Sequence, residues 1–355
     1  MSARVVRLQG LRNSGADQRA CAAMTQVHRD GRVRPGRIVI RSAFARLARQ
    51  LDMTVYSDRR VPERHLRPPA TRLVHSRGCA LQLYLTLLFE AQCRTFPGGS
   101  PGLNKRALKP MSATADEASW VDLVAASTAT DRIISGVRAI NDRERRVRQI
   151  RQALATLAAD DVQLLAFADP GAPRHYQGFR LLHEGGRRAI GDQVSYAVPR
   201  ETEPELFGLD VRLFTNGWIH VLADTELAFL CMVADLQARN AGDDLVPVPG
   251  AVRVGNYCLG TDGYQAHHVL DRLGLIRVRR PRGRRADGTF RGYDPELSGV
   301  VGVPHRFGLL SDGFAQPALR TALRALGGLP DGSSGEATRK PGTNSPAASR
   351  AGRSR

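Results

Sequence analysis

Cationic side chains are concentrated between residues 276 and 291. Seven arginines share this stretch with one carboxylate, that of Asp287. Like charges so close together repel one another unless an anion neutralises them, and the phosphates of nucleic acid are the usual partner of such a cluster. The spacing therefore predicts a phosphate-binding surface formed by Arg277, Arg279, Arg280, Arg282, Arg284, Arg285 and Arg291.

The surrounding residues predict that a helix and a β-hairpin carry this cluster. One helical stripe at i, i+3, i+4 and i+7 is apolar, and it consists of Ala266, Val269, Leu270 and Leu273. The strand LIRVRR then enters the turn PRGRRADG, and a returning strand is expected near PHRFGLL. A shorter helix is expected at residues 251–259, and LGTDGY supplies a turn with Asp or Thr as the next N-cap.

The outward face of this helix is expected to be polar. Thr261, Tyr264, His268, Asp271 and Arg272 lie opposite the apolar stripe. Asp271 would repel phosphate unless it accepts a hydrogen bond from cytosine or pairs with Arg272. The residues expected to contact DNA here are Tyr264, Gln265, His268 and Arg272.

A second helix of the same kind is expected in the first half of the chain. Its buried stripe consists of Val147, Ile150, Leu154 and Leu157. The sequence NDRE at 141–144 predicts a capping box at its start. Arginine can donate to guanine and glutamine can pair with adenine in the major groove. The expected contacts are Arg145, Arg148, Gln149 and Gln152.

Three pairs of segments recur in the same order in the two halves and predict an internal duplication. LQLYLTLLFEAQCR (81–94) corresponds to ELAFLCMVADLQAR (226–239). The helix and strand at 147–167 correspond to those at 266–278, and YQGFRLLHEGG (176–186) corresponds to PHRFGLLSDGF (304–314). Each half therefore reads as helix, short elements, helix, strand, polar loop and strand.

The run VLDRLGLIRVRRPRGRRADGTFRGY resembles the recognition helix and wing of winged-helix DNA-binding proteins. The two-unit plan also resembles plasmid replication initiators and related proteins built from tandem winged helices. The sequence departs from the usual pattern at Asp271 and in the long insertion GYDPELSGVVGV before the last strand. The resemblance implies an α+β, mainly α fold with two tandem winged-helix units, which are helix-turn-helix motifs followed by a β-wing. The composition of the two ends of the chain predicts disordered basic tails.

The net charge of +18 also favours an anionic partner. The only lysines are Lys105, Lys109 and Lys340, so a bias toward arginine inflates the total. The distribution is more informative, with about +11 over residues 1–75, −6 over 151–275 and +6 over 276–330. This clustering exceeds what a uniform bias would produce.

Other chemistries find little support in the sequence. His267 and His268 are adjacent and point to different helix faces, so surface or partly packed residues are expected there and no metal site. The five cysteines contain no CxxC pair, which favours reduced thiols and a cytoplasmic location. No apolar run approaches 18 residues, so no membrane segment is expected. Phe214 and Trp218 are expected in the core.

The predicted organisation has five parts: a basic, largely flexible region at 1–70, a first winged-helix unit at 71–192, an acidic linker at 193–216, a second unit at 217–328 and a disordered basic tail at 329–355. The predicted function is binding of double-stranded DNA by a transcriptional regulator, without catalysis or a cofactor. A replication initiator or partition protein of a mobile element fits the same pattern, as does a winged-helix scaffold for protein assembly. A homodimer is compatible with this plan but not required, and no protein partner is indicated.

Overall fold

The computed structural model describes residues 2–74, 76, 78–109, 117–125, 142–172, 175–186, 194–281 and 303–327. Within these ranges the fold is α+β, with helices predominating and small antiparallel sheets of two or three strands. The predicted tail at 329–355 lies outside the described residues. The class expected from the sequence is therefore confirmed at this coarser level.

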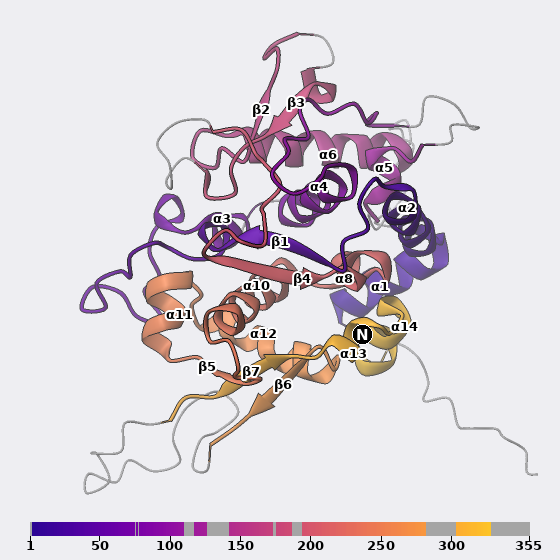
Figure 1. Ribbon diagram of the computed structural model, residues 1–355. Helices are drawn as coiled ribbons and strands as arrows, with labels where there is room; N and C mark the ends of the chain where they lie inside the picture. The colour runs from indigo at the N-terminus through magenta and orange to yellow at the C-terminus, as the bar shows by residue number, and fades with distance from the viewer. Residues whose placement is uncertain are drawn as a thin grey trace, which may run out of the picture.

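A two-stranded sheet lies at the centre of the molecule, between two groups of helices (Figure 1). Strand β1 (Arg37–Arg41) pairs antiparallel with β4 (Leu206–Asp210), so that Ile38 lies opposite Leu209 and Ile40 opposite Phe207. Alternate residues along β1 point into the core, which is why both isoleucines are fully buried. The sheet joins chain segments that are distant in sequence.

The group of elements above this sheet in Figure 1 comes from the first half of the chain. Its longest helices, α4 and α6, pack against each other, and the strands β2 and β3 form a small antiparallel hairpin after α6. Leu103 forms a β-bridge to Arg180 of β3. The elements are α3 (Pro69–Leu73), α4 (Ala80–Arg94), α5 (Trp120–Leu123), α6 (Asp142–Ala158), β2 (Leu165–Phe167) and β3 (Phe179–Leu181).

The group below the sheet comes from the second half (Figure 1). Helix α10 is buried along most of its length, and α12 packs across it. The three strands lie in the order β5-β7-β6. The elements are α10 (Asp224–Arg239), β5 (Val246–Pro247), α11 (Gly250–Tyr257), α12 (Thr261–Arg272), β6 (Ile276–Arg279) and β7 (Arg306–Leu309).

The same order of elements thus occurs in both halves. Each has a buried helix, a short strand or bridge, a short helix, a longer helix and two antiparallel strands. The bridge residue Leu103 pairs with β3 as β5 pairs with β7. In each half the expected helix with an apolar stripe is present, and the expected strand follows it.

The N-terminal region is not the flexible segment that the sequence predicted. It forms α1 (Ala3–Ser14) and α2 (Ala16–Asp30), separated by Gly15 in the left-handed conformation. Leu8, Leu11 and Met24 are fully buried. The prediction was wrong because alanine and arginine dominate this region, so its few large apolar residues did not stand out although they lie at helical spacing.

The acidic segment 193–216 is also more structured than a linker. It contains β4 and the short helix α8 (Arg212–Thr215), and α9 (Trp218–Val221) follows. Its carboxylates serve as partners for buried cations, since Glu203 pairs with Arg41 and Glu205 with Arg46, at 2.8 and 2.7 Å. The acidity that suggested a solvated linker is used instead to fix the chain beside β1.

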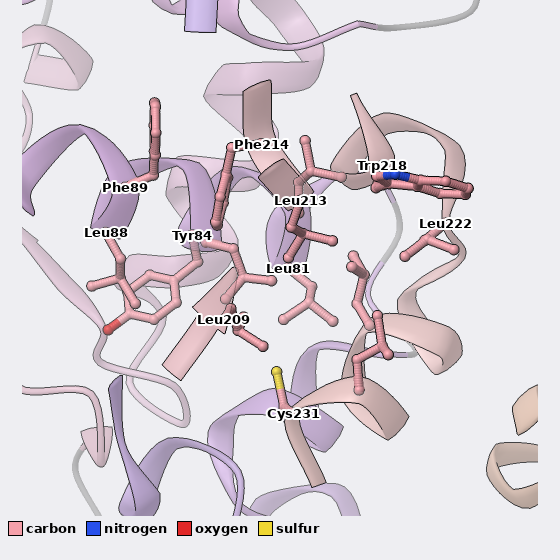
Figure 2. Close-up of a cluster of buried hydrophobic side chains, with 14 of the residues drawn as sticks. Leu81, Tyr84, Leu88, Phe89, Leu209, Leu213, Phe214, Trp218, Leu222 and Cys231 are labelled. Carbon is pink, nitrogen blue, oxygen red and sulfur yellow. The ribbon is translucent and has the colours of Figure 1, made fainter. Parts of the chain in front are cut away.

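The hydrophobic core joins the two halves (Figure 2). The rings of Phe89 from α4 and Phe214 from α8 stack with their centroids 4.9 Å apart. Trp218 is fully buried, and its indole N–H donates to the carbonyl of Phe314 at 3.2 Å. The expectation that Phe214 and Trp218 belong to the core is confirmed.

A buried ionic cluster fixes the segment after β1 to the second half. Asp235 of α10 is fully buried, and its carboxylate accepts hydrogen bonds from Ser42, from Arg46 Nε at 3.2 Å and from the Tyr257 hydroxyl at 2.6 Å. Arg41, the last residue of β1, donates to the buried Glu184 of the first half at 2.7 Å. Neighbouring residues of one segment thus bind carboxylates from both halves.

We expect Leu8→Ala and Leu11→Ala each to lower the free energy of unfolding by about 2–5 kcal/mol, because each leaves a cavity in the core. Val6→Ala is the matched control in the same helix, since Val6 is 52% exposed. It should cost less than about 0.5 kcal/mol. Urea unfolding measures all three, and equal stability of the leucine variants and the control would contradict the packing of α1.

We expect Asp235→Asn to lower the free energy of unfolding by about 3 kcal/mol or more, because the buried Arg46 loses one of its two carboxylate partners and an amide cannot accept every hydrogen bond that the buried carboxylate accepts. Asp243→Asn is the control, since Asp243 is 59% exposed and pairs with Arg306 at 3.2 Å on the surface. Surface pairs contribute about 0–1 kcal/mol. Comparable losses in the two variants would show that the buried cluster contributes little.

Candidate nucleic-acid interface

Helix α12 carries the second set of predicted contacts. Ala266, Leu270 and Leu273 are buried, as the apolar stripe predicted. On the other side Arg272 is exposed, and Gln265 and His268 are partly exposed. Thr261, Asp262 and Asp271 are also exposed on this helix. Helix α12 therefore has a polar face that is open to solvent.

Tyr264 does not lie on this outward face. It is 8% exposed, and its hydroxyl lies 2.7 Å from His305 Nδ1. The guanidinium carbon of Arg253 lies 4.6 Å from the centre of its ring. The expected orientation is wrong because the ring fills the space between α11 and β7, where a cation–π contact and a hydrogen bond are both available.

The expected N-cap of α12 is also wrong. Gly260 occupies the cap position, and no side chain caps the helix. The Thr261 N–H donates instead to the carbonyl of Asp58 at 3.2 Å, which comes from a distant part of the chain. A backbone acceptor therefore replaces the side-chain cap that LGTDGY suggested.

Strand β6 presents the first arginines of the basic run. Arg277 and Arg279 are exposed, while Val278 between them packs against the core, as the alternation of a strand requires. Arg280 is exposed and its Nη2 lies 3.9 Å from Asp271 Oδ2. The carboxylate of Asp271 thus lies near Arg280, a partner that the sequence analysis did not name. Arg282, Arg284, Arg285 and Arg291 lie outside the described residues.

Helix α6 carries the first set of predicted contacts. Arg148, Gln149 and Gln152 are exposed, and Arg145 is half-buried. The stripe of Ile150, Leu154 and Leu157 is buried, with Val147 partly buried against it. The expected cap Asn141 lies outside the described residues.

Sequence reasoning missed one cation on the same helix. Arg151 is exposed, and its guanidinium carbon lies 5.9 Å from the centre of the Tyr176 ring. Its position three residues after Arg148 places it next to the predicted face. That spacing was the available signal.

The structure brings each predicted set together within its own half but keeps the two sets apart. The arginines of β6 follow directly on α12, whereas α6 lies in the other group of helices, across the β1–β4 sheet (Figure 1). An extended ligand would be needed to contact both helices. A small molecule could contact only one.

His267 is fully buried, contrary to the surface or partly packed position expected from the sequence. Its Nδ1 lies 2.5 Å from the Tyr264 carbonyl, and its ring packs beside those of Phe307 and His305. Burial lowers the pKa of His267 to about 4; the Tyr264 carbonyl opposes this, whereas the charges of His268, His305 and Arg280 add to it. The folded protein therefore keeps this ring neutral beneath the outward face of α12.

In the part of the chain that the structure describes, no group of three His, Cys, Asp or Glu side chains is placed to hold a metal ion. None of its helices combines the length and apolar character needed to cross a membrane.

No protein-family model matches the chain, and no curated protein or solved structure shows significant similarity to it. Functional inference therefore depends on the geometry and charge of the chain itself.

We expect the free energy of unfolding to fall as pH is lowered from about 6.5 to 4. In this range the unfolded chain protonates His267 and the folded protein does not, so protons favour unfolding, by up to about 3 kcal/mol for a shift of this size. His267→Gln should show a shallower decline, whereas His65→Gln, at an exposed position, should decline like the wild type. Denaturant unfolding at several pH values measures the slopes, and parallel curves for all three would contradict the prediction.

Proposed function

We propose that the protein binds double-stranded DNA through two winged-helix units, one formed by α4 to β3 and the other by α10 to β7. The order helix, strand, helix, helix, strand and strand is that of a winged helix, and the strand order β5-β7-β6 fits the sheet of such a unit. In this arrangement α12 and α6 are the recognition helices. Strands β6 and β7 belong to the wing of the second unit.

One observation carries the proposal, which is the exposed arginine group beside the polar face of α12. Arg277, Arg279 and Arg280 lie on or directly after the strand that follows this helix, and all three are exposed. Arginines in such a position can bind phosphates while the helix enters the major groove. Gln265, His268 and Arg272 are then the side chains available to read base edges.

The first unit supports the same function in a second place. Arg148, Gln149 and Gln152 are exposed on α6, and these residue types pair with guanine and adenine edges. Because α6 and α12 lie on opposite sides of the β1–β4 sheet, the two helices would contact separate segments of one duplex (Figure 1). A single chain would then read an extended or asymmetric target without a second copy, which suits a transcriptional regulator.

The test is binding of the full chain to labelled duplex fragments over a range of salt concentrations. The full chain is needed because α1 and α2 form part of the core. Changing Arg277, Arg279 and Arg280 to Ala should make the slope of log affinity against log salt shallower by about two to three units. Each lost phosphate contact lowers the magnitude of this slope by about 0.9.

The control variant loses the same charge elsewhere. Arg12, Arg320 and Arg324 are exposed on α1 and on the C-terminal helix α14 (Ala318–Ala325). Their replacement by Ala should leave the salt dependence close to that of the wild type. Absence of DNA binding by the wild type, or equal slopes for the two triple variants, would overturn the proposal and direct attention to protein assembly.

A further inference from the structure

Part of the long connection between β1 and α3 packs against the start of α12. We call residues 47–61 the clamp loop, which in Figure 1 lies beside α11. The N–H groups of Leu47 and Leu51 donate to the carbonyls of Asn256 and Gly255, at 2.8 and 2.9 Å. The loop therefore uses free carbonyls near the end of α11 as its acceptors.

Asp58 fixes the far end of the clamp loop. Its carbonyl accepts from Thr261 N–H, and its carboxylate accepts from Arg253 Nη2 at 2.7 Å. Arg253 is 4% exposed and also donates to the carbonyls of Leu259 and Gly260. One buried guanidinium thus ties the clamp loop to the turn between α11 and α12.

The contact at this turn leaves no room for a side chain. A Cβ atom on Gly260 would lie 2.8 Å from Val61 Cγ1 and 2.9 Å from the Asp58 carbonyl oxygen. Such distances are closer than Cβ atoms adopt in proteins. The clamp loop therefore packs directly against the start of α12.

Two arginines project from the clamp loop. Ser57 and Arg60 exchange backbone hydrogen bonds at 3.1 and 3.0 Å, which places Asp58 and Arg59 in a tight turn. Arg59 and Arg60 are both exposed, and neither forms an ion pair with any residue that the structure describes. Arg59 also lines a hollow of about 320 Å³ together with Thr261 and Asp262. The hollow is also lined by Asp58, whose carboxylate accepts from Arg253.

We propose that Arg59 and Arg60 bind the DNA phosphate backbone beside the first turn of α12. This inference rests on the proposed function. Helix α12 has twelve residues and is about 18 Å long, and the major groove that would receive it is about 12 Å wide between its backbones. The arginines of β6 follow the C-terminal end of α12 and the clamp loop holds its N-terminal end, so the two cationic groups flank the helix and face opposite backbones.

The experiment compares full-length variants on the same labelled duplexes over a salt series. Arg59→Ala with Arg60→Ala should make the salt dependence shallower by about 1.8 units, because two phosphate contacts are lost. Arg59→Lys with Arg60→Lys should restore most of the slope, since a phosphate accepts either cation. Arg320→Ala with Arg324→Ala removes the same charge from α14 and should leave the slope unchanged.

The outcomes separate this inference from the proposed function. One outcome is that the triple Ala variant of β6 has a shallower salt dependence while the Arg59 and Arg60 Ala variant matches the α14 control. The clamp loop then does not contact DNA, and the proposed function stands. If the wild-type chain does not bind duplex DNA, both are overturned. Unfolding midpoints of all variants should agree, because every substituted side chain is exposed.

Discussion

The arrangement of the two halves depends on buried ion pairs made by one short segment. Arg41 and Arg46 extend from the end of β1 in different directions, toward Glu184 of the first half and Asp235 of the second. A buried carboxylate without a cation is unfavourable, so loss of this segment would destabilise both halves. The orientation of α6 relative to α12 therefore follows from a few charged side chains as much as from the apolar core.

Periodic apolar residues made the secondary structure of the candidate interface predictable. The stripes that include Ile150 and Leu270 gave both helices, and the alternation of Arg277, Val278 and Arg279 gave a strand. The environment of Tyr264 was not predictable, because it depends on Arg253 and His305, which approach from other elements. The prediction of the N-cap of α12 was wrong for the same reason, because the group that accepts from Thr261 N–H is the carbonyl of the distant Asp58.

The N-terminal 70 residues show why composition misleads in an arginine-rich chain. A high content of Arg and Ala resembles a solvated tail, but the fully buried Leu8 and Met24 place both helices against the core. Several arginines there are also structural: Arg4 pairs with Glu226, and Arg7 donates to the carbonyls of His220 and Val221. Excess positive charge therefore served as a guide to function only where the side chains proved exposed.

The packing of α1 against α14 has a consequence for synthesis of the protein. These helices lie near opposite ends of the described chain, yet they contact each other. The side chain of Asn216 donates to the Phe314 carbonyl, and the Ala318 N–H donates to the Asn216 carbonyl. Strand β1 likewise cannot pair until β4 is synthesised, about half the chain later. Contacts of such long sequence separation slow folding. During translation α1 emerges long before α14, so the part of its surface that α14 covers stays uncovered until α14 is synthesised.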